Sequence, residues 1–290
     1  MTLFELLTQG TECLEQAGSP DAGNDAKLLL LEAFELDMTH FLLNRMQALP
    51  ENQRTGECTA KYQEWIARRA KRVPLQQILG SQEFMGMEFF VNEHVLIPRQ
   101  DTETLVELVL EREKHTQKRV IDLCAGSGCI GISLAVLGSF EYVAEADLSE
   151  EALKVTRKNI ERLAGESGTR IECFHGDLFS AIPDGTEPFD ILVSNPPYIP
   201  TEVIAGLEPE VRDHEPMMAL DGTEDGLLFY RRIAKEAGKV LSSGASVYLE
   251  IGYDQGEAVR ELLREQGFAE VEVHKDLAGN DRVVCGRFVG

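Results

Sequence analysis

Residues 120–137 read VIDLCAGSGCIGISLAVL: an apolar run of strand length, a glycine-rich turn and an apolar run of helix length. Gly126, Gly128 and Gly131 have the spacing G-x-G-x-x-G. Between a strand and a helix, this spacing lets the backbone approach a nucleotide closely, at the amide-rich N-terminus of the helix. The stretch therefore predicts an α/β sheet with a nucleotide-type ligand at the start of the helix.

The sequence around this stretch alternates between strand and helix patterns. Strands are expected at 120–124, 142–148, 170–178, 189–195 and 246–252, and helices at 129–137, 149–164, 227–240 and 254–267. This alternation predicts a doubly wound, Rossmann-like parallel sheet. Two more strands, 271–276 and 281–288, are joined by too few residues for a parallel crossover, so the sheet should end in an antiparallel hairpin.

The first part of the chain has a different character. Apolar residues recur with helical spacing and never alternate with a period of two, which predicts a small helical bundle. The aromatic and apolar stretch QEFMGMEFFVN that follows is hairpin-like. We expect a helical domain at 1–80, a linking β-hairpin at 81–98 and an α/β domain at 99–290.

The α/β domain should open with a helix. Asp101 or Thr102 can serve as its N-cap, because short polar side chains accept hydrogen bonds from the first backbone amides of a helix. The helix is expected to run to about His115.

The charge of the chain argues against stable binding to nucleic acid. It has 50 acidic and 28 basic residues, a net charge of −22. Most of this excess lies beyond residue 80, so the α/β domain would repel a phosphate backbone. One basic cluster, Arg68-Arg69-Ala70-Lys71-Arg72, is interpreted as a solvated helix end that complements the helix dipole.

Other bulk features indicate a cytoplasmic protein. No apolar run approaches the roughly 18 residues that cross a bilayer, so no membrane association is expected. The acidic, amphipathic amino terminus lacks the basic region of a signal peptide. The six cysteines form no C-x2-C pair, which predicts reduced thiols and no metal site.

Two acids and the terminal hairpin favour S-adenosylmethionine over NAD as the nucleotide-type ligand. Asp122 could face a cationic methionine amino group, Asp177 could accept from an adenine amino group, and an antiparallel hairpin is atypical of a dinucleotide fold. Asp147 could bind the ribose hydroxyls of either ligand. Asp177 could instead be a helix N-cap. An NAD-type oxidoreductase remains an alternative, since a lone glycine motif is weak evidence.

The tetrapeptide Asn195-Pro196-Pro197-Tyr198 follows the strand expected at 189–195. Two consecutive prolines stop the sheet ladder, because neither has a backbone N–H to donate. The Asn195 side-chain carbonyl and the proline carbonyls could then accept both hydrogens of a planar –NH2 group. This arrangement favours chemistry on an amide or an exocyclic amine.

These motifs together resemble the PrmC (HemK) family of protein-(glutamine-N5) methyltransferases, which are class I S-adenosylmethionine-dependent enzymes. The segment 97–103, IPRQDTE, resembles that family's I-P-R-x-D-T-E, and QEFMG (82–86) resembles its hairpin. DGTEDGL (221–227) resembles its loop after the tetrapeptide. Cys124 departs from the pattern, because many members have the first glycine of G-x-G-x-G there.

The resemblance implies methyl transfer to the N5 atom of the glutamine in the Gly-Gly-Gln motif of class I peptide chain release factors. It implies a docking role for the helical domain. It implies the catalytic residues Asn195, Pro196 and Tyr198, with Pro197 also contacting the substrate. The residues expected to bind S-adenosylmethionine are Asp122, Cys124, Ala125, Gly126, Ser127, Gly128, Asp147, Asp177, Leu178 and Asn195.

The tetrapeptide by itself leaves the acceptor open. Adenine-N6 methyltransferases of DNA and RNA share it, and a related subfamily methylates a ribosomal protein glutamine. The acidic surface argues against nucleic acid. The segment 97–103 is the narrower marker, and it favours release factors.

Overall fold

The computed structural model describes residues 1–114 and 117–290, which fall into two compact units. One unit comprises residues 1–80 together with 208–214, and the other comprises 81–207 and 215–290. Segment 208–214 thus belongs by its contacts to the helical unit, although both of its neighbours in sequence belong to the α/β unit. Each unit is described separately below.

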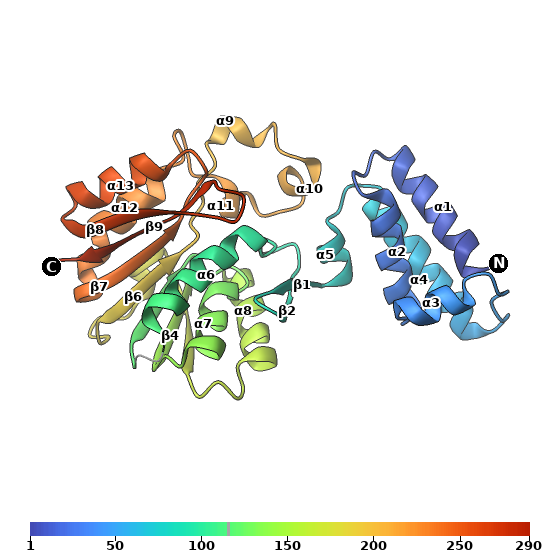
Figure 1. Cartoon of the computed structure of the whole chain (residues 1–290), viewed down its shortest axis with the longest axis horizontal. Coiled ribbons are helices and arrows are strands. Elements are labelled where there is room, and N and C mark those ends of the chain that lie inside the picture. The colour runs from blue at the N-terminus through green and yellow to red at the C-terminus, as the bar shows by residue number, and fades with distance from the viewer. Residues whose placement is uncertain (115–116) are drawn as a thin grey trace. The chain divides into compact units, whose positions relative to one another are not determined.

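Residues 1–80 of the helical unit form five helices around one apolar core (Figure 1). Thr2 caps the first helix in a capping box with Glu5, and Asn52 caps the fourth. Leu6, Leu14 and Leu29 are fully buried, as the helical periodicity predicts. The helices are α1 (Leu3–Gln16), α2 (Ala22–Ala33), α3 (Met38–Asn44), α4 (Gln53–Arg69) and α5 (Leu75–Leu79).

The basic cluster at 68–72 is not a solvated helix end, and that interpretation is wrong for two of its cations. Arg69 is 5% exposed, and its Nε donates to Asp25 Oδ2 at 2.7 Å. Its Nη2 donates to Glu210 Oε1 at 2.8 Å, and Arg72 Nε donates to the same oxygen at 2.6 Å. The two guanidinium groups hold the pKa of Glu210 near 2 although burial opposes this shift. The cluster therefore anchors segment 208–214.

The α/β unit is built on a seven-stranded sheet of order β5-β4-β3-β6-β7-β9-β8 (Figure 1). All neighbours pair in parallel except β7–β9 and β9–β8, which are antiparallel. A separate two-stranded hairpin precedes the sheet. The strands are β1 (Ser81–Phe84), β2 (Met87–Phe90), β3 (Arg119–Leu123), β4 (Tyr142–Asp147), β5 (Arg170–His175), β6 (Phe189–Ser194), β7 (Leu241–Glu250), β8 (Phe268–Lys275) and β9 (Asp281–Phe288).

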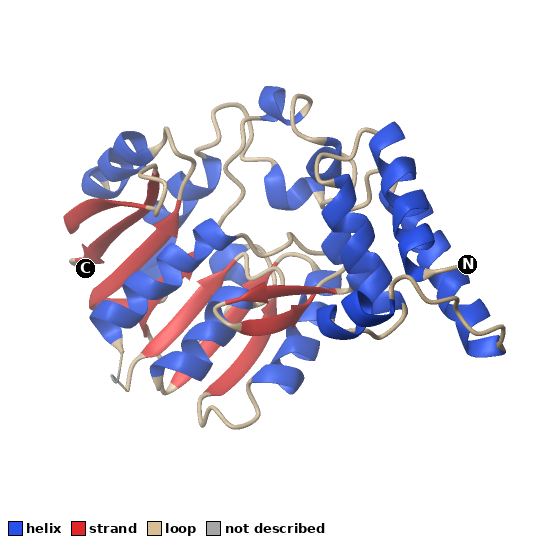
Figure 2. Ribbon diagram, turned by 45° about the vertical axis from the view of Figure 1, so that its right-hand side comes forward, coloured by secondary structure: helices blue, strands red, loops and turns tan. Residues whose placement is uncertain are grey.

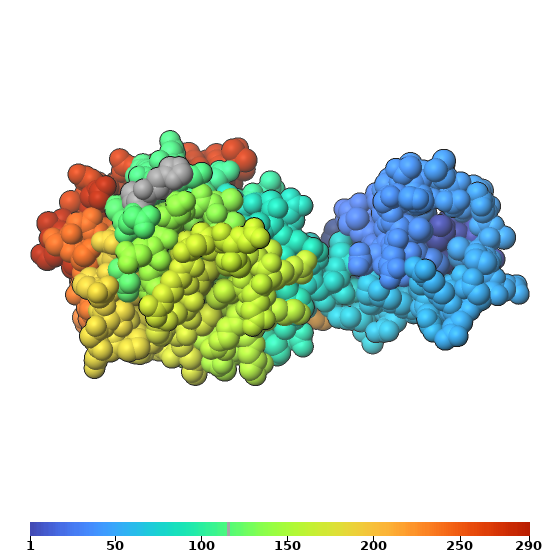
Figure 3. Space-filling model, turned by 90° about the horizontal axis from the view of Figure 1, so that it is seen from below, coloured from blue at the N-terminus to red at the C-terminus, as the bar shows by residue number. Residues whose placement is uncertain are grey.

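Helices cover both faces of this sheet (Figure 2). The longer ones are α6 (Gln100–Glu113), α7 (Cys129–Gly138), α8 (Glu150–Leu163), α12 (Leu228–Glu236) and α13 (Gly256–Glu265). Short turns complete the unit: η1 (Leu178–Ala181), α9 (Thr201–Ile204), α11 (Met217–Leu220) and η2 (Ala237–Lys239). The short helix α10 (Pro209–Arg212) lies in segment 208–214 and belongs to the helical unit. Seen from below, α8 and the chain after it form part of the surface (Figure 3).

Strand residues alternate between two apolar clusters, one on each face of the sheet. Val120 and Ile191 belong to one cluster, whereas Ile121 and Leu192 belong to the other. Because successive side chains of a strand point to opposite faces, continuous apolar runs are expected in a sheet covered on both sides. Among the described residues, no helix is long and apolar enough to cross a membrane.

The expected doubly wound sheet with a terminal antiparallel hairpin is confirmed, but details differ. The fifth strand of the parallel set, β7, begins at Leu241, five residues before its apolar run. The predicted N-cap is wrong: Arg99 occupies that position without a side-chain cap bond. Asp101 and Thr102 lie inside the first turn, where tertiary contacts engage both side chains. The expected helix end near His115 lies outside the described residues.

Candidate active site

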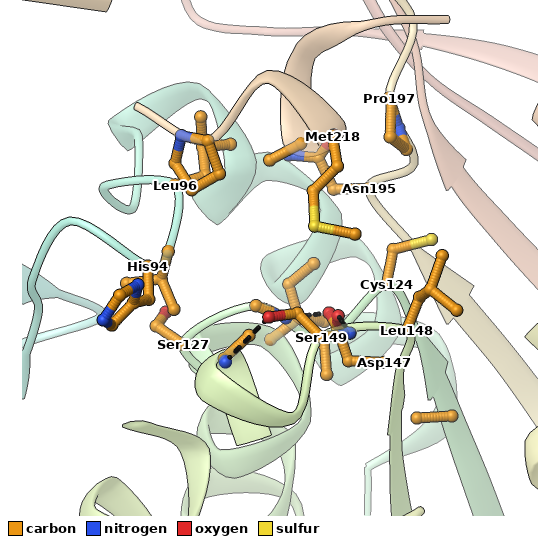
Figure 4. Close-up of a pocket in the computed structure, with 18 of the residues that line it drawn as sticks. His94, Leu96, Cys124, Ser127, Asp147, Leu148, Ser149, Asn195, Pro197 and Met218 are labelled. Atoms are coloured by element: carbon orange, nitrogen blue, oxygen red, sulfur yellow. Dashed lines mark hydrogen bonds between the residues drawn. The ribbon is translucent and has the colours of Figure 1, made fainter. Parts of the chain in front are cut away.

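A cavity of about 480 Å³ opens at the carboxyl ends of the central parallel strands. Its walls come from the loop after β3 and from the ends of β4 and β6 (Figure 4). The strand order reverses between β4-β3 and β6, and open α/β sheets bind ligands at such a switch point. Of the expected site residues, the cavity is lined by Cys124, Ala125, Gly126, Ser127, Asp147, Asp177, Leu178, Asn195 and Pro197.

The glycine loop has left-handed backbone at three positions. Gly126 and Gly128 have φ values of 58° and 77°, and a Cβ on Gly128 would lie 2.7 Å from Thr156 Cγ2. Cys124 also has a positive φ, 61°, in the left-handed region that favours glycine. A side chain in this region costs about 1–2 kcal/mol, so the loop geometry is maintained against local strain. Gly128 does not line the cavity; it starts α7.

Asp147 lies at the end of β4 with its carboxylate beside the glycine loop (Figure 4). Its Oδ2 accepts from Gly126 N and its Oδ1 from Ser149 N, both at 2.8 Å. Burial raises the pKa of Asp147, and these two amide hydrogen bonds partly offset that shift. Each oxygen retains a further lone pair, so the carboxylate can accept hydrogen bonds from a ligand in the cavity.

Asp177 lies after β5, where its Oδ2 pairs with Arg232 Nη2 at 2.8 Å. Asp177 precedes the short turn η1 and makes no side-chain cap bond to it. The next residue, Leu178, is 6% exposed and has a φ of 49°. Asp177 and Leu178 together border the side of the cavity formed by the third expected strand.

Asp122 lies behind the glycine loop and is fully buried, not in the cavity wall. Its Oδ2 accepts from Gly131 N at 2.9 Å, in the first turn of α7. In the register of β3 and β4, Asp122 is opposite Glu145, which is also fully buried. A Cβ on Gly131 would lie 2.3 Å from Glu145 Oε1, so only glycine leaves room for this acid. Burial raises the pKa of both carboxyl groups, and the neighbouring Asp122 carboxyl raises that of Glu145 further.

We expect Glu145→Gln to reduce the dependence of stability on pH. A buried acid whose folded pKa is raised takes up a proton on folding, so its stability contribution falls as pH rises from its unfolded pKa to its folded pKa. The amide of the variant carries no such proton. The free energy of unfolding of the variant relative to wild type should therefore increase from pH 5.5 to pH 8.5, by roughly 1 kcal/mol per pH unit where the acid titrates. Scanning calorimetry of both proteins across this pH range measures the difference in stability. A difference that does not change with pH would contradict the uptake of a proton by Glu145 on folding.

The tetrapeptide 195–198 leaves the sheet directly after β6. Asn195 and Pro197 line the cavity, whereas Pro196 is buried and Tyr198 is half-buried behind it. The Tyr198 carbonyl accepts from Gln255 Nε2 at 3.0 Å, and a Cβ on Gly226 would lie 2.3 Å from it. The close approach of Gly226, whose φ is 71°, explains the glycine in the loop 221–227.

Four side chains of segment 97–103 reach different parts of the α/β unit. Arg99 Nη2 binds both oxygens of the buried Glu215 at 2.8 and 2.9 Å. Asp101 pairs with Arg282, and Asn195 Nδ2 donates to Thr102 Oγ1 at 3.4 Å. Glu103 accepts from the amide of Met85 at 2.6 Å, in the hairpin. The segment therefore holds together the surroundings of Asn195.

Several lining residues were not expected from the sequence. His94 and Leu96 come from the loop before α6, and Met217 and Met218 come from α11. Figure 4 shows the Met218 side chain extending into the cavity near Asn195. Leu148 and Ser149 follow Asp147 directly, at the junction between the strand expected at 142–148 and the helix expected at 149–164.

Comparisons with known proteins agree with this arrangement. The chain matches two family models: PrmC N-terminal domain over residues 5–80 and Methyltransferase small domain over residues 99–205. A crystal structure of a methyltransferase from Pyrococcus furiosus is similar in fold, with a TM-score of 0.53 at 17% identity over 77% of this chain and 98% of that one. The α/β unit thus has the fold of class I methyltransferases.

Two curated relatives match almost from end to end. The chain is 41% identical over 286 residues to the release factor glutamine methyltransferase of Geobacter sulfurreducens, covering 99% of this chain and 96% of the relative. It is 39% identical over 285 residues to that of Clostridium acetobutylicum, covering 98% of each. The chain therefore belongs to the release factor glutamine methyltransferase family.

Proposed function

We propose that this protein transfers a methyl group from S-adenosylmethionine to the side-chain amide nitrogen of the glutamine in the Gly-Gly-Gln motif of class I release factors. Family membership supports the reaction and the substrate class. The observation in the structure that carries the proposal is the position of Asn195, which borders the same cavity as the glycine loop and Asp147.

The residues around the cavity suit S-adenosylmethionine. The volume of about 480 Å³ lies in the range of small-molecule sites. Asp147 offers acceptor capacity for ribose hydroxyls, Asp177 and Leu178 would border the adenine, and Cys124 to Ser127 would lie against the methionine part. When bound, the cofactor supplies a methyl group on a positively charged sulfur. Asp122 supports this wall from behind through Gly131.

Asn195 makes an otherwise poor nucleophile reactive. An amide nitrogen is weakly nucleophilic because its lone pair is delocalised into the carbonyl group. If Asn195 Oδ1 and the Pro196 carbonyl accept its two hydrogens, the lone pair is directed at the methyl group and the nitrogen can become pyramidal. As the C–N bond forms, the bond from sulfur to the methyl carbon would break and the sulfur would leave as a neutral thioether. Positive charge then grows on the nitrogen, and the two fixed carbonyl dipoles stabilise it more in the transition state than in the ground state. The nitrogen would lose one N–H proton after the transfer. Tyr198 would support the substrate amide from the same loop.

The parts of the chain would have different roles in recognition of the release factor and in methyl transfer. We assign residues 1–80 to docking of the release factor, residues 81–98 to the connection and residues 99–290 to methyl transfer. An absence of stable nucleic-acid binding agrees with the net charge of −22. A cytoplasmic location agrees with a substrate from translation.

The decisive test offers labelled S-adenosylmethionine with three purified acceptors: a class I release factor, ribosomal proteins and DNA. We expect label only on the release factor, at the glutamine of Gly-Gly-Gln, as peptide mass spectrometry would locate. Substituting that glutamine by alanine in the release factor is the control, and it should remove the label. Label on ribosomal protein or DNA alone would overturn the proposal.

We expect Asp147→Ala to weaken the binding of S-adenosylmethionine by about 10- to 100-fold, because a hydrogen bond to a charged group contributes about 1.5–3 kcal/mol. Asp147→Asn is the matched control, since one oxygen remains to accept from a ligand, and its loss should be smaller. Isothermal titration calorimetry measures both affinities. An unchanged affinity in Asp147→Ala would refute the ribose assignment.

A further inference from the structure

Two buried side chains lie beside Asn195: Thr102, which also borders the cavity, and Glu250, which does not line it. Thr102, in the first turn of α6, is 2% exposed and accepts from Asn195 Nδ2 at 3.4 Å. Glu250, the last residue of β7, is 1% exposed, and the Thr102 and Asn195 side chains lie close enough to lower its pKa by acting as donors. Among the described residues, none donates a hydrogen bond of regular geometry to Glu250 Oε2, so the carboxylate keeps acceptor capacity beside this pair.

The chemistry of these groups determines the direction of the hydrogen bonds. An ionised carboxylate only accepts, so Glu250 takes the hydroxyl hydrogen of Thr102. The Thr102 oxygen is then left as an acceptor, which an amide NH2 group satisfies and an amide oxygen does not. The Nδ2 end of Asn195 must therefore face Thr102 and Glu250, and the carbonyl oxygen Oδ1 must face the opposite way.

We infer that Glu250, acting with Thr102, is a positioning residue that selects the rotamer of the Asn195 amide in which Oδ1 faces the acceptor –NH2 group. This inference rests on the proposed methyl transfer. Without the selection, the Asn195 amide could turn over and present its own NH2 to the substrate NH2, and two donors repel. Thr102 belongs to segment 97–103, so the role gives that segment a function in the reaction.

The arrangement depends on the ionisation of Glu250. Burial raises the pKa of Glu250 to about 7, and the hydrogen bonds from Thr102 and Asn195 oppose this shift. Below that pH the protonated acid becomes a donor, and the direction of the hydrogen bonds is no longer determined. The titratable and charged groups that act on Glu250 are Asp101 on α6, Cys129 on α7, Tyr198 after β6, Tyr230 on α12 and Arg282 on β9.

The test compares four variants of the full chain with a release factor as acceptor. Glu250→Gln keeps the volume but offers both a donor and an acceptor, so kcat should fall by about 10²-fold. Thr102→Val removes the linking hydroxyl and should lower kcat similarly, and Thr102→Ser should restore most of it. Glu113→Gln is the matched control. Glu113 is another buried glutamate, bound to Ser246 and Tyr248 of β7, and its replacement should not change kcat.

Two readouts separate positioning from a structural role. The affinity for S-adenosylmethionine, measured by calorimetry, should stay within about threefold in Glu250→Gln, because the group lies behind Asn195. The wild-type kcat should fall below about pH 7, following the Glu250 pKa, and this acid limb should be absent from Glu250→Gln. An active wild type whose Glu250→Gln variant keeps its kcat and its acid limb would overturn the inference. A wild type inactive on release factor would instead overturn the proposed function.

Discussion

Asn195→Ala is expected to lower kcat for methyl transfer by more than about 10³-fold while leaving the affinity for S-adenosylmethionine within about tenfold. Asn195 lies after β6 in the cavity wall, where its carbonyl can accept from the substrate amide. Alanine removes this acceptor together with the orientation that it imposes, and both effects act mainly in the transition state. Single-turnover assays with a release factor, combined with calorimetry for the cofactor, separate the two quantities.

Asn280→Ala is a suitable control, because it removes the same amide group from an exposed turn of the α/β unit, away from the cavity. We expect this variant to retain wild-type kcat. Near-normal turnover of Asn195→Ala would refute the proposed hydrogen bonding of the acceptor. Loss of cofactor binding together with turnover would instead assign Asn195 to the cofactor.

The core of the site follows from the order of strands in the sequence. The carboxyl ends of parallel strands meet at one edge of a sheet, so residues that follow different strands are brought together there. Asp147, Asp177 and Asn195 each follow such a strand, and all three line one cavity. The glycine loop was recognisable because its spacing reflects a local backbone requirement.

Other features depend on contacts that no local pattern encodes. Met218 reaches the cavity from a helix of only four residues, too short for periodicity to reveal. Glu145 is a single acid inside an apolar strand, and its partner Asp122 is apparent only from the register of β3 and β4. The sequence predicts helix capping for Thr102, because Thr102 is a short polar residue near the start of a helix. Its proximity to β7 depends on the tertiary fold and is not visible in the sequence.

The largest effect on stability is expected from Arg69→Ala in the helical unit. The Arg69 side chain is 6% exposed, and its partners Asp25 and Glu210 are 9% and 16% exposed. Removing the guanidinium leaves the Asp25 carboxylate buried without its cation, a change that typically costs about 3–5 kcal/mol. Trp65 on α4 is the chain's one tryptophan, so its fluorescence reports on this unit alone. The urea midpoint of that signal should fall by at least about 1 M.

Arg54→Ala provides the matched control, because Arg54 and Glu35 form an ion pair of similar length, 2.8 Å, in the same unit. Their side chains are 75% and 73% exposed, and exposed pairs contribute less than about 1 kcal/mol. A second test replaces both buried charges, in Asp25→Leu with Arg69→Met. Since no uncompensated Asp25 carboxylate remains and Arg72 still binds Glu210, this double variant should be more stable than Arg69→Ala. Equal midpoint shifts for Arg69→Ala and Arg54→Ala would show that the buried ion pairs of Arg69 stabilise the unit no more than the exposed pair does. That result would contradict a role of Arg69 in anchoring segment 208–214.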